Sequence, residues 1–200
     1  MDADRFEKQI QFILEIDKLK SISRRTYLMN AERHENTAEH SWHLAIMAIL
    51  LAEHANETVD VARVVKMVLI HDVVEIDAGD TYYYDAVGLR DKAERERRAA
   101  DRLFGMLPVE QGKELRELWE EFEACRSPEA RFASALDRFI PQLHNYHTRG
   151  KSWSDHGITA DRIIEGNASM AEGSVKLWEC AQALLDDAVA KGFLRRSNKT

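Results

Sequence analysis

Apolar residues recur every three or four positions along most of the chain, which is the period of an amphipathic α-helix. Residues 4–20 show this spacing, because Phe6, Ile10, Ile13 and Leu14 follow it with polar residues between them. Similar patterns predict further helices at residues 36–56, 60–79, 90–106, from 108, from 128, at 158–169 and at 172–191. We therefore predict an all-α protein of seven or eight helices, folded as a single domain over residues 1–200.

Polar residues mark several of the predicted helix boundaries. Asn36 and Glu39 match a capping box, in which two side chains satisfy the free amides of the first helical turn. Asp60 and Ser127 suit N-cap positions, and Gly79 suits a helix stop. The predicted connecting segments are residues 21–35, 80–90 and 150–157. The helix after Asn36 is apolar on all sides in its middle, so we expect it to be central, with Trp42 in the core.

Three ionisable residues continue an apolar stripe on the third predicted helix. The stripe comprises Val61, Val64, Val65, Val68 and Leu69. Steps of three and four then lead to His71, Asp72 and Glu75. Burying an unpaired carboxylate is very costly, so these groups need a partner. A divalent cation is one such partner, since imidazole and carboxylate both suit it as ligands.

Two other predicted helices place polar residues beside apolar stripes. His40 lies one turn before Leu44, and Asp137 lies three residues before Ile140. His40, His71, Asp72 and Asp137 would then converge from three helices and leave coordination positions open for water and substrate. The alternative is a buried cluster of hydrogen-bonded polar residues that binds no metal.

Composition and charge narrow the classes of partner. The chain has 200 residues and a net charge of −7, which disfavours binding to a nucleic-acid polymer but allows a small phosphorylated substrate beside a metal ion. The longest apolar run, residues 44–52, is too short to span a membrane. The first residues show no signal-peptide pattern, and Cys125 and Cys180 are expected to be buried free thiols. We expect a cytoplasmic protein.

The order of these residues resembles that of the HD-domain metal-dependent phosphohydrolases. The resemblance is carried by His40 within the string Glu-Asn-Thr-Ala-Glu-His-Ser, by the doublet His71-Asp72 with Glu75 and Asp80 after it, and by the distant Asp137. It covers about residues 10–190. The two longer strings are similar to those of the branch that includes bacterial 5′-deoxynucleotidases and their eukaryotic relatives.

The resemblance implies a helical bundle that holds one divalent cation, Mn, Co, Zn, Ni or Fe, and hydrolyses a phosphomonoester, most simply a nucleoside 5′-monophosphate. It also implies a homodimer. The implied metal ligands are His40, His71, Asp72 and Asp137. Glu75 matches the catalytic acid/base carboxylate and Asp80 an active-site aspartate, while Arg25 matches an arginine that meets the substrate, with Arg24 or Arg33 as possible helpers.

One position departs from the family pattern. In the deoxynucleotidases a tryptophan that helps to reject the ribose 2′-hydroxyl follows the arginine, and Thr26 stands at that position here. Preference for deoxyribose is therefore an open question. No histidine lies between Asp72 and Asp137, which favours one metal over a dinuclear centre. Two other classes remain: a metal-binding regulatory or small-ligand-binding module without turnover, and a structural all-α protein.

Overall fold

The computed structural model describes residues 3–85 and 87–197 of the chain, and it is almost entirely helical. The α-helices are α1 (Ala3–Ile16), α2 (Thr37–Leu51), α3 (Val61–Ile70), α4 (Glu75–Ala78), α5 (Lys92–Gly105), α6 (Val109–Ala124), α7 (Pro128–His147), α8 (Lys151–Asp155), α9 (Ala160–Asn167), α10 (Met170–Gly173) and α11 (Val175–Ala190). Within the described residues, eight of these helices are at least eight residues long, and the other three are single turns. The all-α prediction is confirmed.

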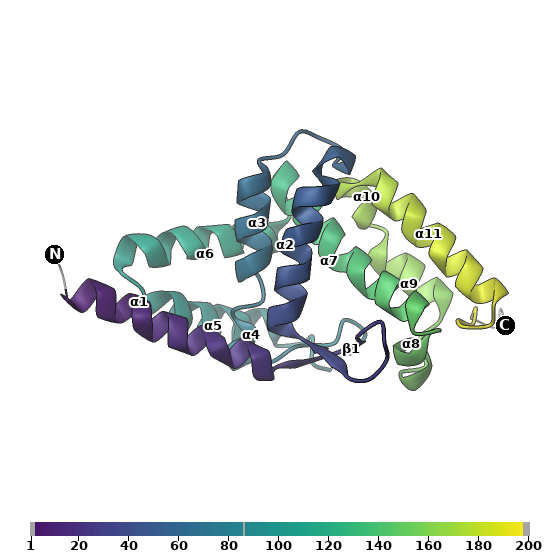
Figure 1. Ribbon diagram of the computed structural model, residues 1–200, viewed down its shortest axis with the longest axis horizontal. Helices are drawn as coiled ribbons and strands as arrows, with labels where there is room; N and C mark the ends of the chain where they lie inside the picture. Colours follow the sequence, from purple (N-terminus) through teal and green to yellow (C-terminus); the bar gives the residue numbers. More distant parts are fainter. Residues whose placement is uncertain (1–2, 86, 198–200) are drawn as a thin grey trace.

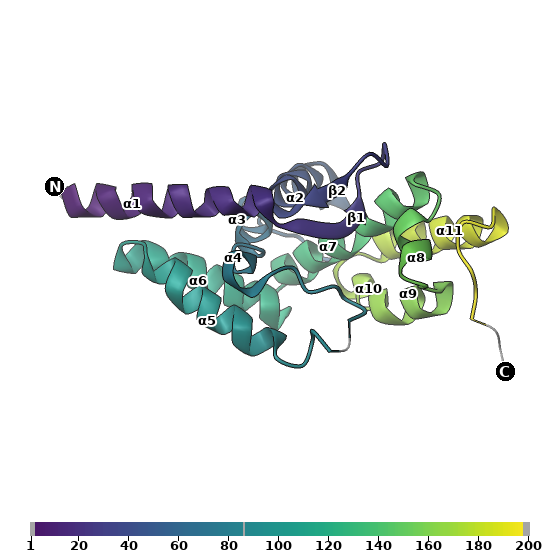
Figure 2. The ribbon, with the colours of Figure 1, turned by 90° about the horizontal axis from the view of Figure 1, so that it is seen from below.

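The molecule is elongated, with helix α7 through its middle (Figure 1). Helices α1, α5 and α6 form one end, α2 and α3 cover the centre, and α8 to α11 form the other end (Figures 1 and 2). Helix α7 contacts α2, α3, α6, α10 and α11. The central core contains the fully buried side chains of Leu44, Met67, Phe132, Leu136 and Ile140. A side chain on the inner face of α7 is therefore held by most of the bundle.

Several predicted helix boundaries are present as side-chain caps. The Asn36 side chain accepts a hydrogen bond from the Glu39 amide, and the Glu39 carboxylate accepts one from the Asn36 amide. Asp60 caps α3, and Ser127 caps α7 with Pro128 in its first turn. Gly79 ends α4 with a φ of +75°, a conformation that glycine adopts at no steric cost.

The structure differs from the predicted elements at three places. In place of the predicted connecting segment 21–35, an antiparallel pair of short strands, β1 (Ser23–Tyr27) and β2 (His34–Asn36), follows a 3₁₀ turn at Asp17–Ser21. The third predicted helix is broken, because α3 ends at Ile70 and His71 to Val74 form a turn before α4. The segment 150–157 contains the short helix α8 instead of being wholly a loop.

Two burial predictions were wrong. Trp42 is 63% exposed on the outer face of α2, because the neighbouring helices cover only the opposite face. Cys180 is also exposed, while Cys125 is partly buried, and both are free thiols. Among the residues described, none of the helices combines the length and the apolar character that a membrane crossing requires.

Candidate functional site

Four potential metal ligands converge from three parts of the fold. His40 lies in the first turns of α2, which the Asn36 capping box fixes at its start. His71 is the C-cap of α3, and Asp72 follows it in the turn before α4. Asp137 lies in the middle of α7. The caps and the break after Ile70 therefore direct all four side chains toward one point.

The distances among these side chains are those of a compact polar centre. His40 Nε2 lies 2.9 Å from Asp137 Oδ1 and 3.9 Å from Asp72 Oδ2. His71 Nε2 lies 3.1 Å from Asp72 Oδ1 and 3.8 Å from Asp137 Oδ1. Both histidines are buried, with exposed fractions of 0% and 4%. The sequence predicted that these four residues would meet, and the structure brings all four together.

The carboxylates of the centre are strongly biased toward the charged form. Burial acts to raise the pKa of Asp72, but the positive charges of His71 and Arg24 outweigh it and hold that pKa at about 2. Burial opposes ionisation of Asp137 as well, yet its hydrogen bond with His40 and the nearby His71 imidazole hold its pKa well below the usual range. The same carboxylates raise the pKa of His71 against the effect of its burial. The centre therefore favours positive charge.

Arg24 is the arginine that reaches this centre. Its Nη1 donates a hydrogen bond of 2.8 Å to Asp72 Oδ2, and its Nη2 lies 3.9 Å from Asp137 Oδ1. Burial disfavours the charged guanidinium, but Asp72, Glu75 and other carboxylates more than compensate and raise its pKa. Arg24 therefore stays charged beside the ligand set.

The two arginines predicted to meet the substrate lie farther out. Arg25 is more exposed than its neighbour Arg24 in β1, and it lines the same cavity. Arg33 is exposed, and its guanidinium makes two hydrogen bonds of 2.6 and 2.8 Å with the Glu39 carboxylate. Arg33 is not among the residues that line the cavity.

Glu75 lies at the first residue of α4 with only 7% of its surface exposed. Its Oε2 accepts a hydrogen bond of 2.9 Å from the Thr37 hydroxyl. Burial and the charge of Asp72 raise the pKa of Glu75 well above its ordinary value. A carboxyl group with a raised pKa keeps its proton to a higher pH than usual, which suits it to general acid/base catalysis.

A cavity of about 490 Å³ opens beside the centre. Asp72, Glu75, Asp80 and Asp137 line its inner part, so Asp80 is placed with the other predicted catalytic residues. Burial raises the pKa of Asp80. The remaining wall includes Arg25, Thr26, Lys92, Arg138 and the three consecutive tyrosines Tyr82 to Tyr84. The volume suits a small organic molecule, and the inner end suits an anionic group beside Arg24.

Known proteins of similar sequence show which family the chain belongs to. The family profile described as the HD domain matches residues 16–178 of the chain. The chain belongs to the HD-domain family. It is 32% identical to a human protein named 5′-deoxynucleotidase HDDC2 over 161 residues, which covers 77% of this chain and 78% of the human one. It is 35% identical over 131 residues to the bovine protein of the same name, a match that spans 64% of this chain and 62% of the bovine protein.

The HD-domain fold is matched over nearly the whole chain by a solved structure. That structure, from Magnetospirillum magnetotacticum MS-1, is named a "Predicted metal-dependent phosphohydrolase". It is 51% identical in sequence, covers 96% of both chains and superposes with a TM-score of 0.92. The resemblance to the HD-domain metal-dependent phosphohydrolases and the single helical fold are both confirmed.

The group formed by His40, His71, Asp72 and Asp137, hereafter the HD centre, fits a divalent cation, as one of its nitrogen atoms indicates. His71 Nδ1 lies 2.9 Å from the Val68 carbonyl oxygen, the geometry of a donated hydrogen bond. In the neutral ring, Nε2 then carries a lone pair. This Nε2 is buried and has no hydrogen-bond partner, although carboxylate oxygens of Asp72 and Asp137 surround it. Lone pairs facing carboxylates repel one another unless a cation lies between them.

Sequence reasoning gave one residue at the centre only a secondary role and missed another. It placed Arg24 second to Arg25, because adjacent arginines cannot be ranked until the strand shows which one faces inward. It gave no role to Glu35, which is 2% exposed and has its Oε2 3.3 Å from His40 Nδ1 and 3.7 Å from Arg24 Nε. The position of Glu35 in the Glu-Asn-Thr-Ala-Glu-His-Ser string was the available signal.

Proposed function

We propose that this protein is a metal-dependent phosphohydrolase that releases phosphate from a nucleoside 5′-monophosphate. The observation that carries the proposal is the convergence of His40, His71, Asp72 and Asp137 beside Arg24 at the inner end of a cavity of about 490 Å³. The names of the deoxynucleotidase relatives and of the phosphohydrolase structure support it.

A single divalent cation in the HD centre, held by His40, His71, Asp72 and Asp137, completes the proposed site. When bound, it would neutralise charge on the phosphate and lower the pKa of a water molecule. Mn, Co, Ni, Zn and Fe all suit a set of two imidazoles and two carboxylates, so availability decides among them. The affinity of the centre depends on pH, because the cation competes with the proton that the carboxylates hold on His71.

The protein's own residues supply the remaining chemistry. Arg24 presents a planar guanidinium to the phosphate, a geometry that favours paired hydrogen bonds to phosphate oxygens. Glu75 faces the same cavity with a raised pKa, so it can take a proton from the attacking water and return one to the leaving oxygen. Asp80 is placed to orient the water or a sugar hydroxyl. Arg25, nearer the rim, would contact the outer side of the phosphate.

The outer cavity would accept the nucleoside. The cavity is lined there by Tyr82, Tyr83 and Tyr84. These side chains also pack within the protein, because the Tyr83 hydroxyl donates to the Gly166 carbonyl and the Tyr82 and Tyr84 rings meet edge to face. Their ring faces suit stacking on a base. Thr26 also lines the cavity, at the position where the family resemblance expects a tryptophan that helps to reject the ribose 2′-hydroxyl.

The test is phosphate release from paired 5′-deoxy- and ribonucleoside monophosphates. Chelator-stripped protein is assayed after Mn²⁺, Co²⁺, Ni²⁺ or Zn²⁺ is restored. We expect metal-dependent release that Asp72→Ala abolishes and that Asp101→Ala, a change at an exposed carboxylate paired with Arg116, leaves intact. Metal binding with no release from any pair would support a binding module without turnover instead. The ratio of the release rates for deoxyribonucleotides and ribonucleotides measures the sugar selectivity of a site that has Thr26 in place of the tryptophan.

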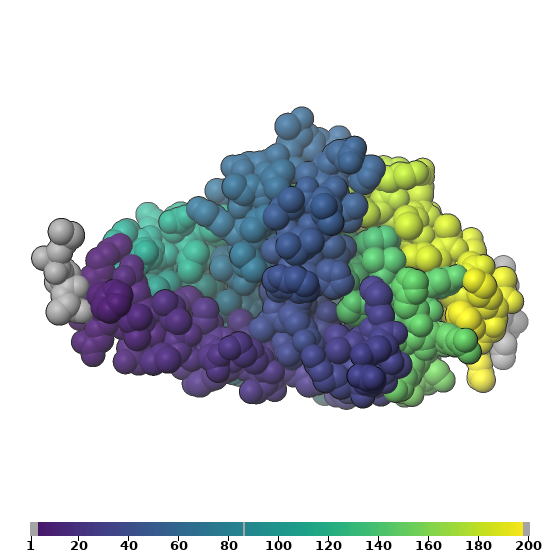
Figure 3. All heavy atoms as spheres, viewed as in Figure 1, coloured from purple at the N-terminus to yellow at the C-terminus, as the bar shows by residue number. Residues whose placement is uncertain are grey.

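We also propose a homodimer that acts in the cytoplasm, where nucleoside monophosphates occur. The outer face of α2 exposes Trp42, Ile46, Ile49 and Leu50. Helix α2 lies on the face of the molecule that Figure 3 shows. Contiguous exposed apolar side chains are typical of an interface. Light scattering is expected to give twice the mass of the chain and to give the monomer mass for Trp42→Ser with Ile49→Ser. A monomeric wild type would contradict this proposal.

A further inference from the structure

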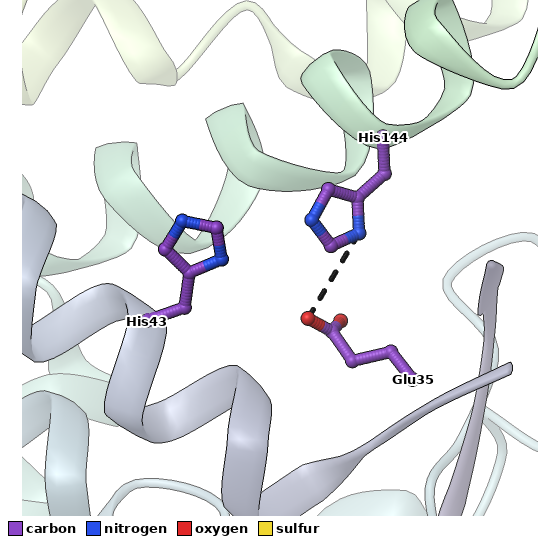
Figure 4. A group of neighbouring side chains, drawn as sticks. All are labelled: Glu35, His43 and His144. Carbon is purple, nitrogen blue, oxygen red and sulfur yellow. Dashed lines mark ion pairs between the residues drawn. The ribbon is translucent and has the colours of Figure 1, made fainter. Parts of the chain in front are cut away.

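A second group of metal-binding side chains lies next to the HD centre. Glu35 comes from β2, His43 from α2 and His144 from α7, and all three point into the same space (Figure 4). One ligand atom from each lies within 4.8 Å of the other two. Glu35 and His144 are almost fully buried, and His43 is half-buried. None of the three is a ligand in the HD centre.

The hydrogen bonding of this group is incomplete. His144 Nδ1 is buried without a hydrogen-bond partner, and the nearest carboxylate oxygen, Glu35 Oε1, lies 3.9 Å away, which is too far for a hydrogen bond. The other oxygen of Glu35, Oε2, is turned toward His40 and Arg24. A buried nitrogen and a buried carboxylate oxygen thus face each other across a gap. Such groups normally have a partner.

We infer that Glu35, His43 and His144 form a second divalent-cation site, separate from the HD centre. Two imidazoles and one carboxylate are a common zinc ligand set, and a water molecule takes the fourth position. Ligand atoms around tetrahedral zinc lie about 3.4 Å apart, so small side-chain adjustments from the present spacing suffice. Burial lowers the pKa of His144, which keeps its imidazole neutral and able to bind metal.

Glu35 connects the two sites. Its Oε1 faces the second site, while its Oε2 lies 3.3 Å from Nδ1 of His40, whose Nε2 belongs to the HD centre. A cation on Oε1 would therefore fix the carboxylate that lies beside a ligand of the HD centre, and such outer carboxylates affect metal affinity. The inference concerns metal content alone and does not depend on the proposed phosphohydrolase activity.

The experiment measures metal content in the full chain. Chelator-stripped protein is incubated with excess Zn²⁺, separated from free metal, and analysed by mass spectrometry for zinc per chain. Wild type is expected to hold two ions, and His144→Gln and His43→Gln one ion each. His147→Gln is the matched control, because His147 is exposed on the same helix, and it is expected to hold two. One ion in wild type, or equal content in wild type and His144→Gln, would overturn the inference.

A second variant leaves Glu35, His43 and His144 unchanged. Asp72→Ala combined with Asp137→Ala removes both carboxylates of the HD centre, so it isolates the second site. We expect this variant to keep one ion and, with Co²⁺, to show the visible absorption of a tetrahedral site, which added His43→Gln removes. No tightly bound ion in the double variant would overturn the inference even if His144→Gln failed to fold.

Discussion

Glu75 combines two properties that conflict with each other. Its carboxyl group is buried, and burial together with Asp72 raises its pKa well above the ordinary value. A neutral side chain of the same shape would cost less free energy to bury at that position. Proteins often tolerate such costs at catalytic residues and gain stability when these are replaced.

The first prediction concerns activity. Replacing Glu75 with Gln removes the acid/base group and preserves the acceptor for the Thr37 hydroxyl. We expect kcat to fall by about 10²- to 10⁴-fold, with zinc content unchanged. Steady-state kinetics and metal analysis on the same preparation check this. A variant that loses its metal together with its activity would show that Glu75 supports the ligands instead.

The second prediction concerns stability and pH. Since the folded-state pKa of Glu75 is raised, the folded protein binds more protons than the unfolded chain above about pH 4, the ordinary value. Its contribution is therefore lost as the pH rises through the folded-state pKa. Glu75→Gln does not titrate, so in metal-free protein we expect its Tm to exceed that of wild type at pH 8 and the difference to shrink toward pH 4. Thermal unfolding across this range decides the matter, and a constant difference would contradict it.

The third prediction separates the arginines. Arg24→Gln is expected to lower kcat/KM by about 10²- to 10³-fold, because it removes a fixed charged donor at the reacting phosphate. Arg33→Gln serves as the control, since Arg33 lies in an exposed pair with Glu39, and it is expected to stay within about twofold of wild type because exposed pairs contribute little. Equal losses in both variants would show that Arg33 also meets the substrate.

At the scale of elements, sequence patterns located the long helices well and the short segments poorly. Asn36, Asp60 and Ser127 carry local capping information, and each begins a helix as predicted. Strand β1 reads Ser-Arg-Arg-Thr-Tyr, which has no apolar alternation, and only its pairing with β2 makes it a strand. Helical spacing alone also could not reveal that α3 stops at Ile70.

Within the candidate site too, some residues could be predicted from local sequence and others depend on how distant segments pair. Its four predicted ligands were found because charged residues stood beside apolar stripes, a signal that each segment carries by itself. Arg24 and Glu35 were given minor roles or none, because their positions depend on the pairing of β1 with β2. Trp42 was misplaced because an all-apolar segment does not show which of its faces the neighbouring helices will cover.

The fourth prediction tests the contact between α10 and α7. A Cβ atom on Gly173 would lie 2.1 Å from the Arg131 carbonyl oxygen and 2.9 Å from the Ala135 side chain. We expect Gly173→Ala to lower the free energy of unfolding by about 1–3 kcal/mol, the range for overpacking. Gly105→Ala in α5 meets nothing within 4 Å and is expected to be neutral or stabilising. Urea titrations of both variants give the comparison.

At the scale of the molecule, the HD centre joins α2, the turn after α3, and α7. A cation that binds these ligands only in the folded state adds to stability by mass action, about 2.7 kcal/mol when its concentration is 100 times its Kd. We expect a chelator to lower the Tm of wild type by more than that of Asp72→Ala, which has lost a ligand of the HD centre. Calorimetry with and without chelator measures both shifts, and equal shifts would place the stabilising ion elsewhere.

The separation of these ligands along the chain has a consequence for biosynthesis. His40, His71 and Asp72 are made early, but Asp137 belongs to a helix that runs to His147. Until α7 has left the ribosome, the chain can offer only three of these four ligands, two imidazoles and one carboxylate. The complete ligand set therefore exists only after α7 has emerged and docked. A cation that needs all four ligands would therefore bind late in synthesis, from whatever metal pool the newly finished chain meets.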